Sequence, residues 1–527
     1  MLLFIWLAVV GATLVLYLKE LYSRLSMLGL NHLPTVPLLG NMARVVFRKE
    51  HMVTTIRKSY QAFPDDRLVG HYEFINPLVL IRDAELLKNV MVKDFEHFTD
   101  RRAVGDNNDP IFGRSLLLLK GDEWKAMRST LSPAFTSSKI RLMVPFILEV
   151  GDSMIEHIKK DIAESKTDFD DVNVKDLATR YANDVIATCA FGLKVKSQGH
   201  DNEFYKHARE VTTVDFQRFL KFIGFRSFPS IAKRFNIRLL PKHLGDFFST
   251  VVLGTMSTRE RNNIVRHDMI HLLMEAKKGQ LSHDTSSDAP AGFATVEESN
   301  IGKKKINREW SDNDLVGQAV IFLFAGFETV STAISFLLHE LALNPHVQER
   351  LLQEIRETDA KNEGKVDFNS IQNLTYLDMV VSEVLRMWPG APTLDRVCVK
   401  DYNVGKPHSK AGKDLIIHKG QTLTIPVYSF HRDAQYFPEP DKFDPERFSE
   451  QNRGSINPSV YMPFGAGPRN CIGSRFALCE VKLMVYQLLK HVEVSPCART
   501  CVPSQLDPAT LAMRLQGGHW LRLQLRK

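Results

Sequence analysis

The sequence predicts a mainly α-helical protein with small β-sheets, preceded by one N-terminal membrane-anchor helix. Helical patterns dominate from Ser137 to Glu357, and short β-type stretches occur near Leu68 to Ile81 and near Leu394 to Pro426. An uncharged apolar run, Leu2 to Leu18, opens the chain. The chain therefore divides first into an apolar N-terminus and a long, mostly helical remainder.

The apolar run has the properties of a membrane anchor. At about 1.5 Å per residue it spans roughly 25 Å, which is enough for a thin bilayer such as that of the endoplasmic reticulum. No Lys or Arg precedes the run, and Lys19 and Arg24 follow it, so the positive-inside rule places the rest of the chain in the cytosol. A cleaved secretory signal is the alternative, but the basic segment and the small-residue cleavage site of such a signal are missing.

Composition limits the function classes. At 527 residues, length alone suggests two to four domains, and a hydrophobic content of 44% supports a large core. The net charge of +7 is not concentrated in a basic run with interleaved aromatic residues, so we expect no nucleic-acid partner. A basic membrane-facing surface and a basic docking surface for a partner protein account for this charge.

The stretch from Leu315 to Leu343 contains no Pro and no charge cluster, and is predicted to be a buried helix. Within it lie Gly326, Glu328 and Thr329. The missing side chain of Gly326 is expected to leave space, while the acid and the hydroxyl could relay protons. The alternative for Thr329 is a hydroxyl bonded to a carbonyl one turn back.

A cysteine lies in a glycine-rich run near the C-terminus, from Phe464 to Gly473. A thiolate at Cys471 could ligate a haem iron and favour O–O cleavage of a dioxygen bound opposite to it. Gly467 and Gly473 are expected to allow tight turns that bring amide N–H groups near the sulfur. Taken alone, the run also fits a turn around a buried, inert Cys.

The pattern Phe-x-x-Gly-x-Arg-x-Cys-x-Gly, with Phe464, Arg469 and Cys471, resembles the haem-binding signature of cytochromes P-450. This resemblance implies a cytochrome P-450 fold enclosing haem b, with Cys471 as the metal ligand and dioxygen as co-substrate. It also implies three parts: an anchor at 1–18, a basic and proline-containing linker at 19–40, and one haem-thiolate monooxygenase domain at 41–527.

Three further segments match the same family in the right order: Trp124 to Arg128, Ala325 to Thr329, and Glu383 to Arg386. Glu383 and Arg386 lie three residues apart on one helix face and resemble its Glu-x-x-Arg motif, with Arg447 as the third, structural member. The resemblance assigns catalytic roles to Glu328 and Thr329. It assigns cofactor binding to Arg101, Trp124, Arg128, Arg396, Phe464, Arg469 and Cys471, with Arg102 as the alternative to Arg101.

The electrons are expected to come from another protein, because no Rossmann glycine fingerprint follows a predicted strand. The resemblance names NADPH–cytochrome P-450 reductase as the donor, with cytochrome b5 as a further candidate. Candidate docking residues are Lys125, Lys139 and Arg475. The implied location is the endoplasmic reticulum membrane, with the catalytic domain on the cytosolic face.

The substrate is the least defined part of the prediction. Phenylalanines crowd between Phe216 and Phe235 and could form a membrane-facing entrance for lipophilic substrates or a core patch. The segment Gly121 to Ser137 resembles the group that contains vertebrate drug-metabolising family three and its insect relatives. The segments Asp268 to Ala276 and His431 to Asp433 resemble the insect family-nine branch, and these resemblances imply xenobiotics such as insecticides and plant toxins. The alternatives are an endogenous lipid, steroid or terpenoid substrate, a reductase-independent haem-thiolate isomerase, and a non-catalytic haem carrier.

A mobile loop is expected from Ala289 to Lys305.

Overall fold

The computed structural model describes residues 1–102, 109–213, 234, 240–281, 292–304 and 308–526. The phenylalanines between Phe216 and Phe235 lie outside the described residues, so both interpretations of that segment stay predictions.

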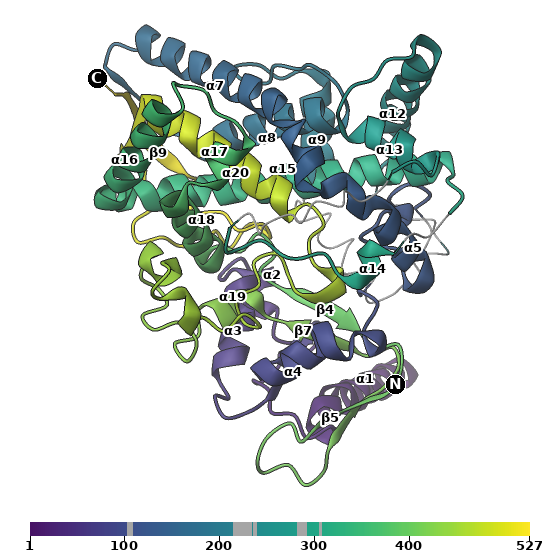
Figure 1. Cartoon of the computed structure of the whole chain (residues 1–527). Coiled ribbons are helices and arrows are strands. Elements are labelled where there is room, and N and C mark those ends of the chain that lie inside the picture. Colours follow the sequence, from purple (N-terminus) through teal and green to yellow (C-terminus); the bar gives the residue numbers. More distant parts are fainter. Residues whose placement is uncertain (103–108, 214–233, 235–239, 282–291, 305–307, 527) are drawn as a thin grey trace.

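Helices make up most of the described chain and surround one long central helix (Figure 1). The helices are α1 (Leu2–Met27), α2 (Ala43–Val46), α3 (Met52–Gln61), α4 (Ala84–Lys88), α5 (Gly121–Leu131), α6 (Ser137–Arg141), α7 (Val144–Glu164), α8 (Val174–Ala190), α9 (Glu203–Thr212), α12 (Lys242–Asn262), α13 (Met269–Lys277), α14 (Asn300–Lys303), α15 (Asp312–Leu343), α16 (Pro345–Lys361), α17 (Phe368–Gln372), α18 (Thr375–Met387), α19 (Val427–His431) and α20 (Ser474–His491).

The strands form three small sheets. The first has the order β1-β2-β7-β4, in which only the β2–β7 pair is parallel; the second has the order β3-β9-β8 and the third pairs β5 with β6. The strands are β1 (Leu68–Glu73), β2 (Asn76–Ile81), β3 (Phe169–Asn173), β4 (Leu394–Val397), β5 (Tyr402–Gly405), β6 (Leu415–Ile417), β7 (Thr422–Ile425), β8 (Val492–Pro496) and β9 (Trp520–Leu525). Both β regions expected from the sequence are confirmed, whereas the sheet β3-β9-β8 was not predicted.

Helix α15 is the centre of the fold, and its prediction as a buried helix is confirmed. Ser311 caps its first turn through a capping box with Asp314, which satisfies N–H groups that a helix start leaves open. Pro345 follows its end and begins α16, because proline cannot continue a preceding helix. Most of the α15 side chains are buried, with α8 packed along it.

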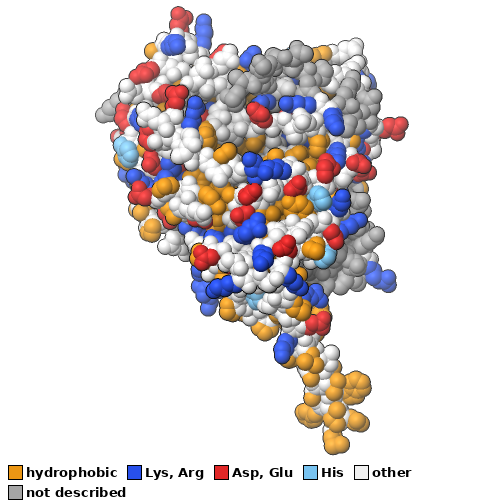
Figure 2. Space-filling view, turned by 60° about the horizontal axis from the view of Figure 1, so that its bottom comes forward, with side chains coloured by type: hydrophobic (Ala, Val, Ile, Leu, Met, Phe, Trp, Pro, Cys, Tyr) orange, Lys and Arg blue, Asp and Glu red, His pale blue; other side chains and the backbone are white. Residues whose placement is uncertain are grey.

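Helix α1 projects from the body and is coated with hydrophobic side chains (Figure 2). Two helices of the described chain, α1 and α15, are long and apolar enough to cross a membrane, but the apolar window of α15 is 67% buried in the protein and that of α1 is 0% buried. Helix α1 continues to Met27, beyond the predicted anchor boundary at residue 18, and Leu21 and Leu25 are buried against the body. The domain boundaries at 18 and 40 stay predictions.

Candidate functional site

The loop that carries Cys471 lies between the short 3₁₀ helix η7 (Gly467–Arg469) and α20. The Cys471 N–H donates to the carbonyl of Phe464 at 2.8 Å and closes the loop. Gly467 has a φ of +66°, and a Cβ there would collide with the carbonyl oxygen of Met91, so only glycine fits. Gly473 also lies in a turn, as expected, but its φ of −94° is one that any residue adopts, so this turn does not require glycine.

The Cys471 thiol lies deep in the protein and yet has accessible surface. Burial raises its pKa, while the N–H of Gly473 and the charges of Arg128 and Arg101 act in the opposite direction. Cys189, Cys398 and Cys479, in contrast, are buried. An accessible thiol inside a protein faces an internal space, and these cations and the Gly473 N–H favour its thiolate form.

Two buried arginines, Arg469 and Arg396, and the half-buried Arg101 surround this loop. The Arg469 guanidinium donates to the carbonyls of Thr99 and Leu119, each at 2.8 Å. Arg396 is 0% exposed, and its Nε and Nη2 have no hydrogen-bond partner within the described part of the chain; the Nε of Arg101 is also buried without one there. Burial first, and then the neighbouring Arg101, lower the pKa of Arg396 to about 9 and that of Arg469 to about 8. Like charges this deeply buried indicate a site for anionic groups.

The structure separates the two candidate arginines near residue 101. Arg102 forms an ion pair with Glu73 at 2.7 Å, and its backbone N–H donates to Asp395. Arg101 instead donates from Nη2 to the carbonyl of Arg469 at 2.9 Å. Arg101 is therefore the one directed to the Cys471 loop.

Trp124 and Arg128, both on α5, are buried but differ in their contacts. The guanidinium of Arg469 lies 4.0 Å from the centre of the Trp124 ring, which fits a cation–π contact. Arg128 donates to the carbonyl and side-chain oxygens of Asn470 at 2.8 and 2.7 Å and forms an ion pair with Glu298 at 2.7 Å. Sequence reasoning missed Glu298, which lies 170 residues from Arg128 in the chain.

These residues fit a haem. A thiolate ligand needs an accessible sulfur in a sheltered loop, and two carboxylates of a buried haem need cationic partners with free N–H groups. Cys471 supplies the first, and Arg101 and Arg396 have buried nitrogens without a partner. Phe464, half-buried, packs beside the loop.

One stripe of α15 is exposed although most of the helix is buried. Ala325 and Thr329 are exposed, and Phe322 is half-buried one turn earlier, a spacing that puts all three on one face. The ring of Phe322 lies 5.4 Å from that of Phe135, which is also the nearest side chain to Gly473. Phe135 therefore brings the exposed stripe of α15 close to the Cys471 loop.

Thr329 and Glu328 lie on different faces of α15. The Thr329 hydroxyl donates to the carbonyl of Ala325 at 2.6 Å, the back-bonded arrangement considered as the alternative. Glu328 forms ion pairs with Lys175 and Arg514, each at 3.2 Å.

Lys175 and Arg514 determine the charge of Glu328. Burial acts to raise the pKa of Glu328, but Lys175 and then Arg514 outweigh it and lower that pKa. Burial lowers the pKa of Lys175 to about 8, with Glu328 opposing the effect. Sequence reasoning missed both cations, because neither lies near Glu328 in the chain.

Gly326 serves a purpose other than the predicted space beside the haem. A Cβ on Gly326 would lie 2.5 Å from Cδ1 of Ile186, so the missing side chain lets α8 approach α15 closely. This packing role was not predicted from the sequence, and the space expected beside Gly326 stays a prediction.

The Glu-x-x-Arg motif forms the predicted structural cluster. Arg386 donates from Nε and Nη2 to Glu383 at 2.7 and 2.9 Å, with both side chains fully buried, and Arg447 lies 3.4 Å from the same carboxylate. Arg386 also donates to the carbonyl of His431, whose Nε2 accepts the N–H of Met462 two residues before Phe464. Because burial lowers the pKa of His431 to about 3, this imidazole is neutral and can accept.

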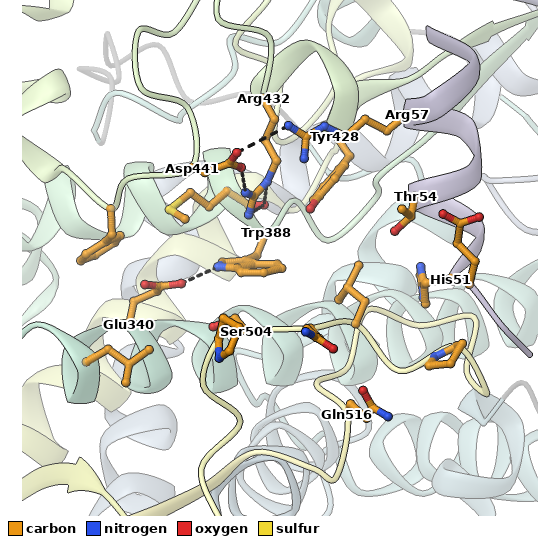
Figure 3. A pocket seen from close by; sticks show the side chains of 18 of the residues that line it. His51, Thr54, Arg57, Glu340, Trp388, Tyr428, Arg432, Asp441, Ser504 and Gln516 are labelled. Carbon is orange, nitrogen blue, oxygen red and sulfur yellow. Dashed lines mark hydrogen bonds and ion pairs between the residues drawn. The ribbon is translucent and has the colours of Figure 1, made fainter. Parts of the chain in front are cut away.

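A separate cavity of about 920 Å³ lies elsewhere, between α3, the end of α15 and the segment 503–516. Figure 3 shows Trp388 in it, with the indole N–H donating to Glu340 at 2.8 Å and Arg432 above the ring. Its lining includes no cysteine, so it is distinct from the Cys471 site.

A helical fold with small sheets, and a loop that presents an accessible cysteine among buried arginines, define the class of haem-thiolate proteins. The family model described as Cytochrome P450 matches residues 31–521. "Cytochrome P450 9e2" of Blattella germanica is 41% identical over 94% of this chain and 92% of its own length, and "Probable cytochrome P450 9f2" of Drosophila melanogaster is 39% identical over 94% of each. "Cytochrome P450 6k1" of Blattella germanica is 36% identical over 92% of this chain and 89% of its own length.

The chain belongs to the cytochrome P450 family, and the resemblance to the insect family-nine branch is confirmed. It is a monooxygenase whose cofactor is haem b with an axial thiolate and whose co-substrate is dioxygen. Like other family members it needs a redox partner and a lipophilic substrate, and electrons from NADPH through a reductase are typical of the class.

Proposed function

We propose that this chain is a membrane-anchored monooxygenase in which Cys471 is the axial ligand. Arg101, Arg396 and Arg469 would hold the two haem carboxylates, with Trp124, Arg128 and Phe464 completing the binding site. The observation that supports this assignment is the set of buried guanidinium nitrogens without partners beside an accessible thiol. When bound, the haem supplies the oxidising chemistry, and the chain holds it, excludes water and delivers protons.

Proton delivery is proposed for Glu328 and Thr329 in separate roles. The Thr329 hydroxyl faces the internal space and, with its own proton on Ala325, keeps lone pairs that can accept from a water there. Glu328 is paired with Arg514, whose side chain is 37% exposed, so this carboxylate can exchange protons with the surface side. Lys175, with a pKa near neutrality, is a donor within reach of the Glu328 carboxylate.

The electron donor is proposed to be NADPH–cytochrome P-450 reductase, with cytochrome b5 as a second donor. Of the candidate docking residues, Lys125 is paired with Glu96 at 2.8 Å and Lys139 is half-buried. The proposed location is the endoplasmic reticulum membrane, with α1 inserted through its exposed apolar residues and the catalytic domain in the cytosol.

The proposed substrates are lipophilic xenobiotics, such as insecticides and plant toxins. The support is the resemblance of the α13 segment to the insect family-nine branch, and of the α5 segment to the wider group that contains vertebrate drug-metabolising family three. An endogenous lipid, steroid or terpenoid is the alternative. Shifts of the Soret band across a panel of both compound classes would separate the two.

The axial assignment is tested by the carbon monoxide complex. We expect the reduced complex to absorb at about 450 nm, the position of a thiolate-ligated haem. Cys471→His should move the band to the histidine-ligated position, whereas Cys501→Ser should leave it unchanged. A wild type without the thiolate band, or a Cys471→His variant that keeps it, would show that the assignment is wrong.

NADPH consumption tests the reaction class. With added reductase and a lipophilic substrate, a monooxygenase consumes NADPH and forms an oxygenated product. An isomerase or a haem carrier does not, even if its thiolate band is intact.

A further inference from the structure

The segment between α13 and α15 lies against the Cys471 loop. The sequence predicts a mobile loop from Ala289 to Lys305, but residues 292–304 pack on the body and include α14 (Figure 1). We call residues 292–304 the strap. At its first end, the Phe293 N–H donates to Asp378 of α18 at 2.8 Å, and the Phe293 ring packs 5.0 Å from that of Phe448 and 5.4 Å from that of Tyr461.

The middle of the strap contacts the residue before the cysteine. Asn470 donates from Nδ2 to the carbonyl of Glu297 at 2.9 Å. Next in the strap, Glu298 accepts from Nε and Nη2 of Arg128 at 3.2 and 2.7 Å, while the same arginine donates to two oxygens of Asn470. Arg128 is 2% exposed and Glu298 20%, so the pair is sheltered from water.

The second end of the strap is fixed to α5. The Ser129 hydroxyl donates to the carbonyl of Lys304. Gly302 is buried there, and a Cβ on it would lie 2.6 Å from the Ser132 hydroxyl oxygen, so α14 fits closely only without a side chain at this position.

We propose that the strap braces the thiolate loop and that Glu298 is its positioning residue. Glu298 binds one side of the Arg128 guanidinium and so holds Arg128 against Asn470, which adjoins Cys471. The inference rests on the proposed role of Cys471 as the ligand.

The hydrogen bonds of Arg128 support this role. A guanidinium has five N–H groups, and four hydrogen bonds to Glu298 and Asn470 leave one free. Arg101 and Arg396, in contrast, have buried nitrogens without partners. Arg128 therefore connects strap and loop, and its remaining N–H can serve the haem-binding role proposed above.

The test measures how long the holoenzyme keeps its thiolate ligand. We expect Glu298→Ala to speed the loss of the band at about 450 nm from the reduced carbon monoxide complex by about tenfold, or about 1.4 kcal/mol. Glu298→Gln, which keeps an acceptor but not the charge, should show a smaller change. Glu297→Ala is the matched control, because that side chain is exposed and only its carbonyl contacts Asn470.

A double-mutant cycle and two further measurements separate positioning from general destabilisation. Arg128→Met and the Arg128→Met/Glu298→Ala double variant should lose the band equally fast, because both break the same connection. The ferric–ferrous potential should shift in Glu298→Ala and not in Glu297→Ala, since the loop tunes the iron. Hydrogen exchange of residues 292–304 should accelerate in Glu298→Ala.

Two outcomes would overturn the brace. The first is loss of the thiolate band at the same rate in Glu298→Ala and Glu297→Ala. The second is slower haem loss from Glu298→Ala than from wild type, since it would mean that Glu298 competes with haem for Arg128. A wild type without the thiolate band contradicts the proposed function instead. The strap is then judged by hydrogen exchange, and unchanged exchange in Glu298→Ala would reject it.

Discussion

Two groups of buried arginines differ in where their partners come from. Around Glu383, Arg386 uses Nε, Nη1 and Nη2 in hydrogen bonds to groups of this chain. Beside Cys471, Arg396 is equally buried, but its Nε and Nη2 have no partner among the residues that the structure describes. Burying an unpaired charge is costly, so the first group is complete as folded and the second needs anions from outside.

The difference separates residues that build the fold from residues that bind the cofactor. Both groups look alike in sequence, as single arginines within family motifs. Removing a charge from the group around Glu383 should destabilise the protein. Removing a charge from the group beside Cys471 should weaken haem binding.

The largest effect is expected for Glu383→Ala. It leaves Arg386 buried without its carboxylate and should lower the free energy of unfolding by about 3–5 kcal/mol. Urea unfolding followed by circular dichroism measures it. The control is Glu164→Ala, from an exposed pair with Lys160, which should change little. Equal effects of the two variants would show that the Glu383 cluster is not structural.

A pH effect is expected at Lys175, which has partners in the chain and yet is strongly desolvated. Its pKa of about 8 in the folded protein lies below the ordinary value of 10.5, so the unfolded chain binds more protons between these values. The free energy of unfolding should therefore gain up to about 1.4 kcal/mol per pH unit as pH rises through this window. Lys175→Met should lose this gain, and Lys160→Met should keep it. The same pH profile for wild type and both variants would contradict the assignment of the pH effect to Lys175.

A smaller effect is expected for Arg396→Met, which should weaken haem binding without lowering the stability of the haem-free protein. The haem-free protein should be no less stable than wild type, because an unpaired buried charge is removed. The holoenzyme should lose haem about tenfold faster, since a carboxylate loses its cation, and transfer to an excess of a haem-binding apoprotein measures this rate. Arg102→Met is the comparison: it should cost stability through Glu73 and leave haem loss unchanged. Faster haem loss from both variants would remove the distinction between Arg101 and Arg102.

The sequence predicts what contiguous segments encode. The Cys471 loop, the helix α15 and the Glu383–Arg386 pair each lie within a short stretch, and so their roles can be inferred from spacing. The pairs Arg128–Glu298 and Lys175–Glu328 join residues 170 and 153 positions apart, and only the tertiary structure brings them together. The strap was interpreted as a loop because its polar and glycine-containing sequence carries no helical period.

The sheet β3-β9-β8 was missed for a related reason. Every residue of β3 is half-buried, so the strand lacks the alternation of buried and exposed residues that identifies a strand in a sequence. Its pairing with β9 also joins distant parts of the chain, from Phe169 with Gln524 to Asn173 with Trp520.

The last turns of α1 are fixed directly to strand β1 of the body. The Tyr72 hydroxyl donates to the carbonyl of Leu21 at 3.0 Å and accepts the N–H of Leu25, and Gly70 lets the Leu25 side chain lie directly on β1. With the apolar run of α1 proposed as the anchor, no hinge separates it from the sheet, so the helix axis sets the tilt of the whole domain. One residue inserted between Leu18 and Leu21 would turn the apolar run by about 100° relative to the body. Angular register, and not only length, then decides which face of the enzyme meets the lipid.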